Sequence, residues 1–83
     1  MNHQIPSTPG AYLLIRDNVI IYVGHTDNLA RRYQEWHDPD NVCVKRSGWD
    51  SFRYFPTTSI LAAQGLEREY YRRYNPVCNF VSP

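Results

Sequence analysis

Glu67 is the residue whose position most clearly suggests chemistry, because it is a carboxylate on the apolar side of a predicted helix. The helix is expected to begin after Ser59, a good N-cap residue, and to end near Tyr74, before Asn75-Pro76. At about 100° per residue, Glu67 points into the same apolar stripe as Ala63. Burial of a carboxylate is costly unless a cation, hydrogen-bond donors or a metal ion compensates the charge. The sequence therefore predicts a partner for Glu67.

Arg32 is the first candidate for that partner, because it lies at the edge of the apolar stripe on a second predicted helix. Two interpretations stay open. In the structural one, Arg32 and Glu67 form a partly buried salt bridge, or Glu67 simply reaches water from the end of its stripe. In the functional one, the two charges share a cleft with Tyr12 and Tyr22.

Tyr12 and Tyr22 are expected on one face of a β-hairpin. Apolar runs at residues 11–15 and 19–23 predict its two strands. The connection Arg16-Asp17-Asn18 suits a three-residue turn, because Asn tolerates positive φ. That turn would place Tyr12 directly opposite Tyr22, whereas a two-residue turn would send the two rings to opposite faces.

The remaining elements are predicted from periodicity and from the Pro, Gly and Asx residues that interrupt it. A helix is expected to extend to about His37, with Thr26 or Asp27 as its N-cap. Its core-facing residues recur at i, i+4 and i+7: Leu29, Tyr33 and Trp36. Residues 40–48 are expected to form a loop, and the alternating run 51–55 to form a third strand.

The composition limits the function further. Nine Lys+Arg against eight Asp+Glu give a net charge of +1, which excludes the overall basic signature of a strong nucleic-acid binder. The 83 residues allow a single domain, residues 1–83, and no apolar run approaches the roughly 20 residues of a membrane span. Cys43 and Cys78 lack metal-ligand spacing, so we expect reduced thiols, no zinc site and a cytoplasmic location.

Short motifs in a fixed order extend over nearly the whole chain, from about residue 9 to residue 80. Gly10-Ala11-Tyr12 is followed, ten residues from tyrosine to tyrosine, by Tyr22-Val23-Gly24. The later members of the set are Arg32, Glu67 and Asn79. Together these motifs resemble the signature of the GIY-YIG nuclease superfamily. The resemblance implies an α/β (α+β) domain with a three-stranded antiparallel sheet flanked by helices, in the order β-β-α-β-α that periodicity also predicts.

The resemblance also implies a role for each motif residue. Glu67 would bind one divalent ion, Mg²⁺ or Mn²⁺, and Arg32 would hold the scissile phosphate. Tyr12 and Tyr22 would position or deprotonate the attacking water, and which of them is the base stays open. A tyrosine with a pKa of about 10 needs a nearby cation, the metal or Arg32, to act as a base near neutral pH. Three residues would maintain the structure of the motifs: Gly10, Gly24 and Asn79.

Two histidines are auxiliary candidates. Members of the superfamily often carry a histidine one turn after the arginine, whereas here Trp36 follows Arg32 by four residues and His37 by five. His25 comes directly after the second glycine motif, where some members carry lysine, and could reach the same phosphate or carry a proton. The alternative for each histidine is an ordinary surface position.

The function implied by the resemblance is metal-dependent hydrolysis of DNA phosphodiester bonds, at branched, damaged or flapped structures. The alternative is a nucleic-acid-binding or scaffold module that keeps the fold without cutting. Because 83 residues leave no room for a reader domain, specificity is expected from DNA shape, from a protein partner or from a second copy of the chain. No membrane partner is expected.

Overall fold

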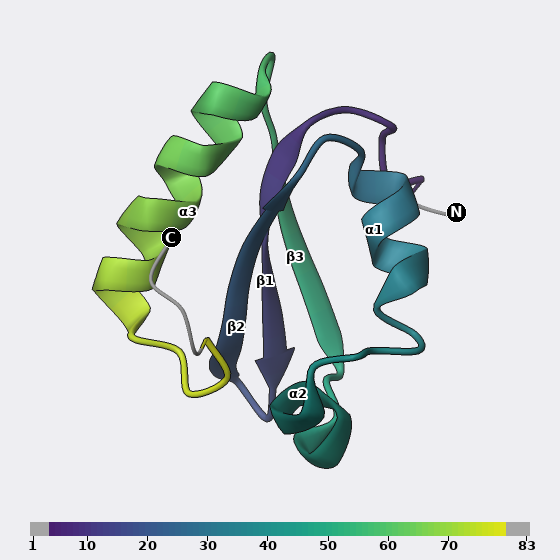
Figure 1. The fold of residues 1–83 in the computed structure, drawn as a ribbon, viewed down its shortest axis with the longest axis vertical. Helices are drawn as coiled ribbons and strands as arrows, with labels where there is room; N and C mark the ends of the chain where they lie inside the picture. Colours follow the sequence, from purple (N-terminus) through teal and green to yellow (C-terminus); the bar gives the residue numbers. More distant parts are fainter. Residues whose placement is uncertain (1–3, 80–83) are drawn as a thin grey trace.

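The computed structural model describes residues 4–79 and contains a three-stranded antiparallel sheet with helices on both faces (Figure 1). The strands are β1 (Gly10–Arg16), β2 (Val19–Thr26) and β3 (Ser51–Pro56), in the spatial order β2-β1-β3. The helices are α1 (Leu29–Glu35), α2 (Val42–Ser47) and α3 (Ile60–Tyr74). The predicted fold class is confirmed, with α2 as an additional helix.

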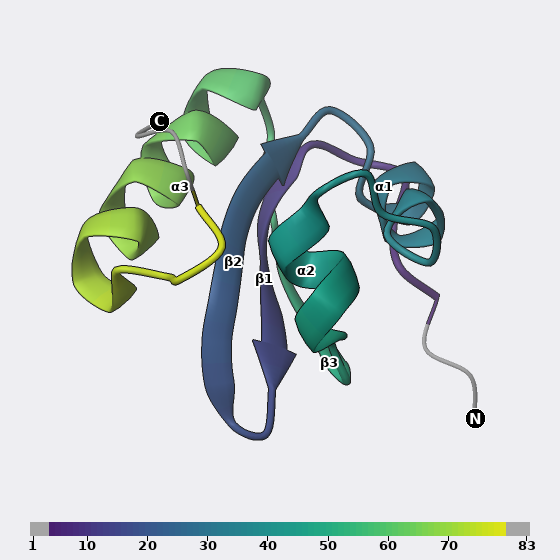
Figure 2. The same ribbon diagram turned by 60° about the horizontal axis from the view of Figure 1, so that its bottom comes forward.

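α1 and α2 cover one face of the sheet and α3 covers the other (Figure 2). Successive side chains of a strand point to opposite faces, so the strands contribute to two separate cores. The core beneath α1 and α2 comprises Tyr12, Leu14, Ile21, Leu29, Trp36, Val44 and Cys78. The core beneath α3 comprises Leu13, Ile15 and Val23, with Phe55 and Tyr70 packed against them. Over residues 4–79, no helix is long and apolar enough to cross a membrane.

The hairpin between β1 and β2 differs from the predicted one in its turn. Asp17 and Asn18 have φ of 50° and 66°, and they form the two-residue turn that needs positive φ at both central positions. Asp and Asn tolerate this left-handed conformation better than most residues, even without the glycine that such turns favour. The predicted three-residue turn is therefore wrong.

A β-bulge nevertheless keeps the two tyrosines on one face. The register shifts at Ile21, which has no partner on β1, and beyond it Gly24 rather than Tyr22 lies opposite Tyr12. The two-residue turn alone would put the rings on opposite faces, and the extra residue reverses that outcome. The predicted Tyr12–Tyr22 pairing is wrong, but the shared face is correct. Glycine is required at position 24, since a Cβ there would lie 2.4 Å from Cζ of Tyr12.

α1 begins later and ends earlier than predicted. Its N-cap is Asn28, whose Oδ1 accepts a hydrogen bond from the backbone N of Arg31 at 3.0 Å, so neither Thr26 nor Asp27 is the cap. The hydroxyl of Thr26 instead accepts from the backbone N of Asn28 at 3.1 Å, which orders the approach to the helix. α3 begins as predicted, with Ser59 as its N-cap.

α2 occupies part of the segment that was expected to be a loop. Asn41 caps it by accepting a hydrogen bond from the backbone N of Val44 at 3.1 Å, and the Val44 side chain is fully buried. A helix of six residues has little stability of its own, so its formation depends on tertiary contacts. Local periodicity could not predict it for this reason.

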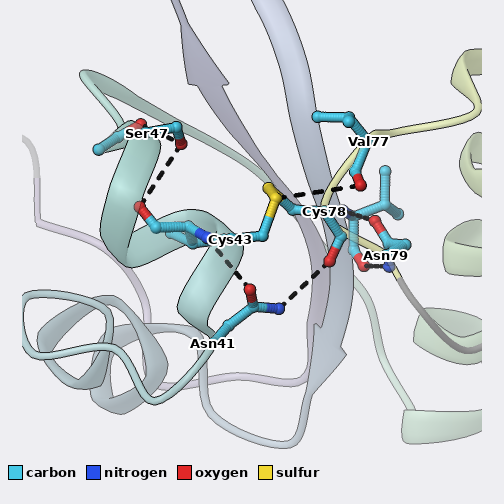
Figure 3. The surroundings of a disulfide bond; sticks show 9 residues. Asn41, Cys43, Ser47, Val77, Cys78 and Asn79 are labelled. Carbon is cyan, nitrogen blue, oxygen red and sulfur yellow. Dashed lines mark hydrogen bonds between the residues drawn. A yellow bond between two sulfur atoms is a disulfide. The ribbon is translucent and has the colours of Figure 1, made fainter.

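The strongest of these contacts is a disulfide between Cys43 of α2 and Cys78, shown in Figure 3. The prediction of two reduced thiols is wrong, because the fold brings together cysteines that lie 35 positions apart in the sequence. The side chain of Asn41 supports the same junction by donating to the carbonyl of Cys78 at 3.2 Å. The predicted cytoplasmic location consequently loses the support that it drew from reduced cysteines.

The disulfide holds the segment after α3 along the outer edge of β2. The backbone N of Cys78 donates to the carbonyl of Ile21 at 2.8 Å. The side chain of Asn79 accepts from the backbone N of Val23 and donates to its carbonyl, at 2.9 Å each. The Asn79 side chain therefore pairs with the free backbone N–H and C=O of the edge strand as a neighbouring strand would, at the residue next to Tyr22.

Candidate active site

The hydroxyl of Tyr12 is the centre of a buried hydrogen-bond network beneath α1. It accepts from Nε1 of Trp36 at 2.9 Å and from Nε of Arg32 at 3.2 Å. Arg32 also donates to Oε1 of Glu35 at 3.0 Å, and its guanidinium lies 4.9 Å from the centre of the Trp36 ring. These contacts fix the orientation of Arg32 at the edge of the buried stripe, the position that helical periodicity predicted.

Trp36 is a site residue that sequence reasoning assigned only to the core. Its spacing contained the signal, because it lies one turn after Arg32 and so on the same side of the helix. Its indole N–H can only donate a hydrogen bond, which makes the Tyr12 oxygen the acceptor.

Tyr22 lies on the edge strand β2 and is half-buried. Its ring centre is 6.3 Å from that of Tyr12 and 4.9 Å from that of Trp36. A cavity of about 540 Å³ borders Tyr22 and is lined also by Arg32 and Trp36. The structure thus brings Tyr22 and Arg32 to one concave surface, and the buried hydroxyl of Tyr12 lies behind it, hydrogen-bonded to Arg32.

Glu67 reaches the same strand from α3, on the opposite face of the sheet. Its side chain is 12% exposed, and its Oε1 forms a hydrogen bond with Nδ1 of His25 at 2.8 Å. The salt bridge between Arg32 and Glu67, one of the two interpretations, does not form among residues 4–79, where Arg32 pairs with Glu35. Burial raises the pKa of Tyr22. The positive charge of Arg32 lowers that pKa, and the negative charge of Glu67 raises it, so both charged groups influence Tyr22.

Tyr12 does not become a better base through its contact with Arg32. Burial raises the pKa of Tyr12 to about 12, and the neighbouring Tyr22 raises it as well. The hydrogen bonds from Arg32 and Trp36 lower the pKa of Tyr12, but they do not offset burial. At neutral pH, Tyr12 is therefore a protonated phenol.

The two auxiliary histidines lie in different places. His25 is beside Glu67, within hydrogen-bond distance. His37 is exposed, its Nδ1 lies 2.9 Å from the carbonyl oxygen of Tyr33, and its ring packs against Trp49 at 5.4 Å. The structure does not bring His37 to Tyr12 or to Glu67.

Gly10 allows α1 to pack closely on the end of β1. A Cβ at this position would lie 2.5 Å from Cδ1 of Leu29 and 2.7 Å from the carbonyl oxygen of Phe55. Any larger residue would displace α1, which bears Arg32.

The fold is similar to that of solved nuclease domains. The chain is 28% identical to the GIY-YIG N-terminal endonuclease domain of UvrC from Thermotoga maritima, which was crystallised with its catalytic divalent cation, magnesium. The TM-score is 0.78, over 89% of this chain and 85% of that chain. Cation-bound variants of that domain with a tyrosine replaced by phenylalanine or an asparagine by alanine give TM-scores of 0.79 and 0.80, at 27% and 26% identity. Each match covers 92% of this chain and 87% of that chain. The chain therefore has the fold of these GIY-YIG endonuclease domains.

A curated relative agrees with this assignment. Over 82 residues, 94% of its length, the chain is 27% identical to UvrABC system protein C from Fusobacterium nucleatum subsp. nucleatum. The chain spans about 14% of the length of that relative. No protein-family model matches the chain.

The residues around Glu67 fit a single hard divalent cation. Within residues 4–79 there is no cluster of three or more His, Cys, Asp or Glu side chains, so any metal must use few protein ligands. Glu67 supplies one carboxylate, with Oε1 oriented by His25 and Oε2 free of any hydrogen bond within the described residues. Mg²⁺ often binds through one or two carboxylates and completes its shell with water and substrate phosphate. The donor set matches that preference.

Proposed function

We propose that this chain is a divalent-metal-dependent endonuclease of the GIY-YIG type that hydrolyses phosphodiester bonds in DNA. The observation that carries the proposal is the placement of three groups on the edge strand β2 or beside it. These are the Glu67 carboxylate, the Tyr22 phenol and the network of Tyr12 with Arg32. The similarity to cation-bound endonuclease domains supports it.

Glu67 would hold the metal ion, because it is the largely buried carboxylate that reaches the edge strand β2 from α3, and its Oε2 has no hydrogen bond within the described residues. When bound, the ion supplies Lewis-acid polarisation of the phosphodiester. His25 binds Oε1 and thereby orients the carboxylate, as residues behind a metal ligand commonly do.

Arg32 would bind the phosphate. Its Nε and Nη1 are used by Tyr12 and Glu35, and among the described residues Nη2 has no hydrogen-bond partner. A guanidinium held at two nitrogens presents the third in a fixed direction, which suits an oxygen of a phosphate group.

The two tyrosines would divide the handling of the water. The Tyr12 oxygen already accepts two hydrogen bonds, so its remaining capacity is to donate its proton to the water or to a phosphate oxygen. The Tyr22 hydroxyl has no hydrogen-bond partner within residues 4–79 and lies nearer to solvent. We therefore assign Tyr22 as the group that accepts the proton of the attacking water, once a bound cation lowers its pKa.

The proposed substrate class is supported by the relative. We propose branched, damaged or flapped DNA in repair, with selectivity supplied by a partner protein or by a second copy of the chain. The relative's assignment to a UvrABC system supports dependence on partners.

The test is cleavage of plasmid and of branched DNA by the purified chain with Mg²⁺, with Mn²⁺ and with EDTA. Glu67→Gln should lower the rate by about 100-fold or more, since loss of several kcal/mol of electrostatic stabilisation has at least that effect. Glu69→Gln is the matched control, because Glu69 is an exposed carboxylate on the same helix, paired with Arg73. Equal metal-dependent cleavage by both variants would refute the assignment of Glu67. DNA binding without cleavage by the wild-type chain would favour the scaffold alternative.

A further inference from the structure

A second concave surface lies beside the candidate active site and is not used by the proposed mechanism. A cavity of about 860 Å³ is lined in part by Tyr33, Trp49, Phe52 and Tyr54. An adjoining cavity of about 560 Å³ shares Tyr33 and Trp49 and adds His37 to the lining. We refer to these five side chains and the two cavities as the aromatic groove.

The rings of the aromatic groove are held in fixed orientations. The Trp49 ring lies 6.0 Å from Tyr33 and 5.4 Å from His37, in edge-to-face geometry in both cases. Nε1 of Trp49 donates to the carbonyl of Trp36 at 3.0 Å. Tyr33 and Trp49 are half-buried and His37 is exposed, so each retains surface toward solvent. A ligand that stacks on these rings would lose little additional side-chain entropy.

The aromatic groove is continuous with the candidate active site around the end of α1. The cavity that contains Tyr22 and Arg32 shares Trp36, Asp38 and Pro39 with the smaller cavity of the groove. A flexible chain bound at Arg32 could therefore extend over the end of α1 into the groove without leaving the concave surface.

The chemistry of the groove favours unpaired nucleobases over a phosphate backbone. Aromatic faces bind planar bases by stacking, and bases inside a duplex do not offer their faces. Asp38 and Asp50 line the two cavities and would repel phosphates there, whereas Lys45 lines the smaller one and can meet a phosphate at its margin. An aromatic groove can also bind a proline-rich peptide. Its continuity with the site of Arg32 favours nucleic acid.

We propose that the aromatic groove binds unpaired bases of a single-stranded nucleic-acid segment that leads away from the phosphate held at Arg32. The proposal deepens the proposed function by naming the part of the substrate that the chain itself recognises. It accounts for a near-neutral net charge in a nuclease, since stacking contributes affinity without added cations.

The experiment measures binding in EDTA, so that it does not depend on catalysis. Fluorescence anisotropy would follow a labelled oligothymidylate of twelve nucleotides, and a labelled duplex of equal length would serve as the comparison. Tyr33→Leu and His37→Ala should each weaken binding of the oligothymidylate by about 5- to 100-fold, the range found for loss of a stacking side chain. Tyr74→Leu is the matched control, because Tyr74 is an exposed aromatic residue at the end of α3 on the other face of the sheet.

Each outcome decides between the two proposals. Weaker binding by the groove variants, with unchanged binding by the Tyr74→Leu variant, supports the groove even if no cleavage is found. The inference is overturned if both groove variants bind the oligothymidylate as tightly as the wild-type chain does, or if the wild-type chain binds the duplex more tightly than the oligothymidylate. Either result leaves the nuclease proposal intact. Binding of a proline-rich decapeptide that is lost in the groove variants would assign the groove to a protein partner and overturn it as well. Circular dichroism melts of Tyr33→Leu and His37→Ala identify any variant that fails to fold. Because His37 is exposed, His37→Ala is expected to fold, so the test does not depend on Tyr33→Leu alone.

Discussion

Reduction of the disulfide between Cys43 and Cys78 should destabilise the domain strongly. The bond closes a loop of 35 residues. For a loop of that length, the disulfide lowers the conformational entropy of the unfolded chain by about 13 cal/mol/K, which corresponds to about 4 kcal/mol of stability at 25 °C. In a domain of this size, each kcal/mol shifts Tm by about 4–8 °C, so the reduced protein should melt roughly 15–30 °C lower.

Reduction of the disulfide should also have a local effect beside the candidate active site. Without the bond, the segment that contains Cys78 and Asn79 keeps its hydrogen bonds to Ile21 and Val23 and the packing of Cys78 in the core, but loses its covalent link to α2. Hydrogen exchange at the backbone N of Val23 should therefore accelerate more than exchange in the central strand β1. Opening of this edge would also change the surroundings of Tyr22.

The measurement is a pair of thermal melts followed by circular dichroism, with and without a phosphine reductant. Thiol titration should give no free thiols before reduction and two after it. The double variant Cys43→Ser, Cys78→Ser is the control, and its Tm should be low and insensitive to the reductant. Two reactive thiols in the air-oxidised protein, or a fall in Tm of less than about 5 °C on full reduction, would refute the reasoning.

Three further predictions concern the site. Gly24→Ala should cost roughly 1–3 kcal/mol of stability in thermal melts, because the new Cβ would lie 2.4 Å from the Tyr12 ring; an unchanged Tm would contradict the packing argument. Arg32→Ala should lower DNA cleavage by about 100-fold or more in a plasmid assay, whereas Arg31→Ala, which removes an exposed arginine of the same helix, should not; equal effects would remove the special role of Arg32. Because burial raises the pKa of Tyr12 from 10.0 to about 12, the free energy of unfolding should be constant with respect to this group below about pH 10. It should then fall by up to about 1.4 kcal/mol per pH unit until about pH 12. Tyr12→Phe should remove that slope in urea titrations, and a slope that persists would mean that another group causes it.

The elements with strong local signals were predictable from the sequence. Ser59 caps α3 as expected, and Glu67 faces the sheet because helical periodicity alone determines which residues share a face. The motif spacing likewise indicated the resemblance to GIY-YIG nucleases, and the similarity to solved domains agrees with it. The hairpin was predicted only in part, because turn chemistry around Asp17 and Asn18 does not reveal a bulge at Ile21. That bulge buries Ile21 in the core that also contains Val44 and Cys78, residues distant in the sequence.

The sequence by itself determined the strands and the two longer helices, and it predicted Tyr12, Tyr22, Arg32 and Glu67 as site residues. Only the tertiary structure decided their partners. Glu67 contacts His25, 42 positions away, rather than Arg32, and the Tyr12 hydroxyl accepts a hydrogen bond from the indole N–H of Trp36. The disulfide and α2 were decided in the same way. Periodicity reports which face of an element a residue occupies, whereas a hydrogen bond or a disulfide depends on the distance between two faces, which packing alone sets.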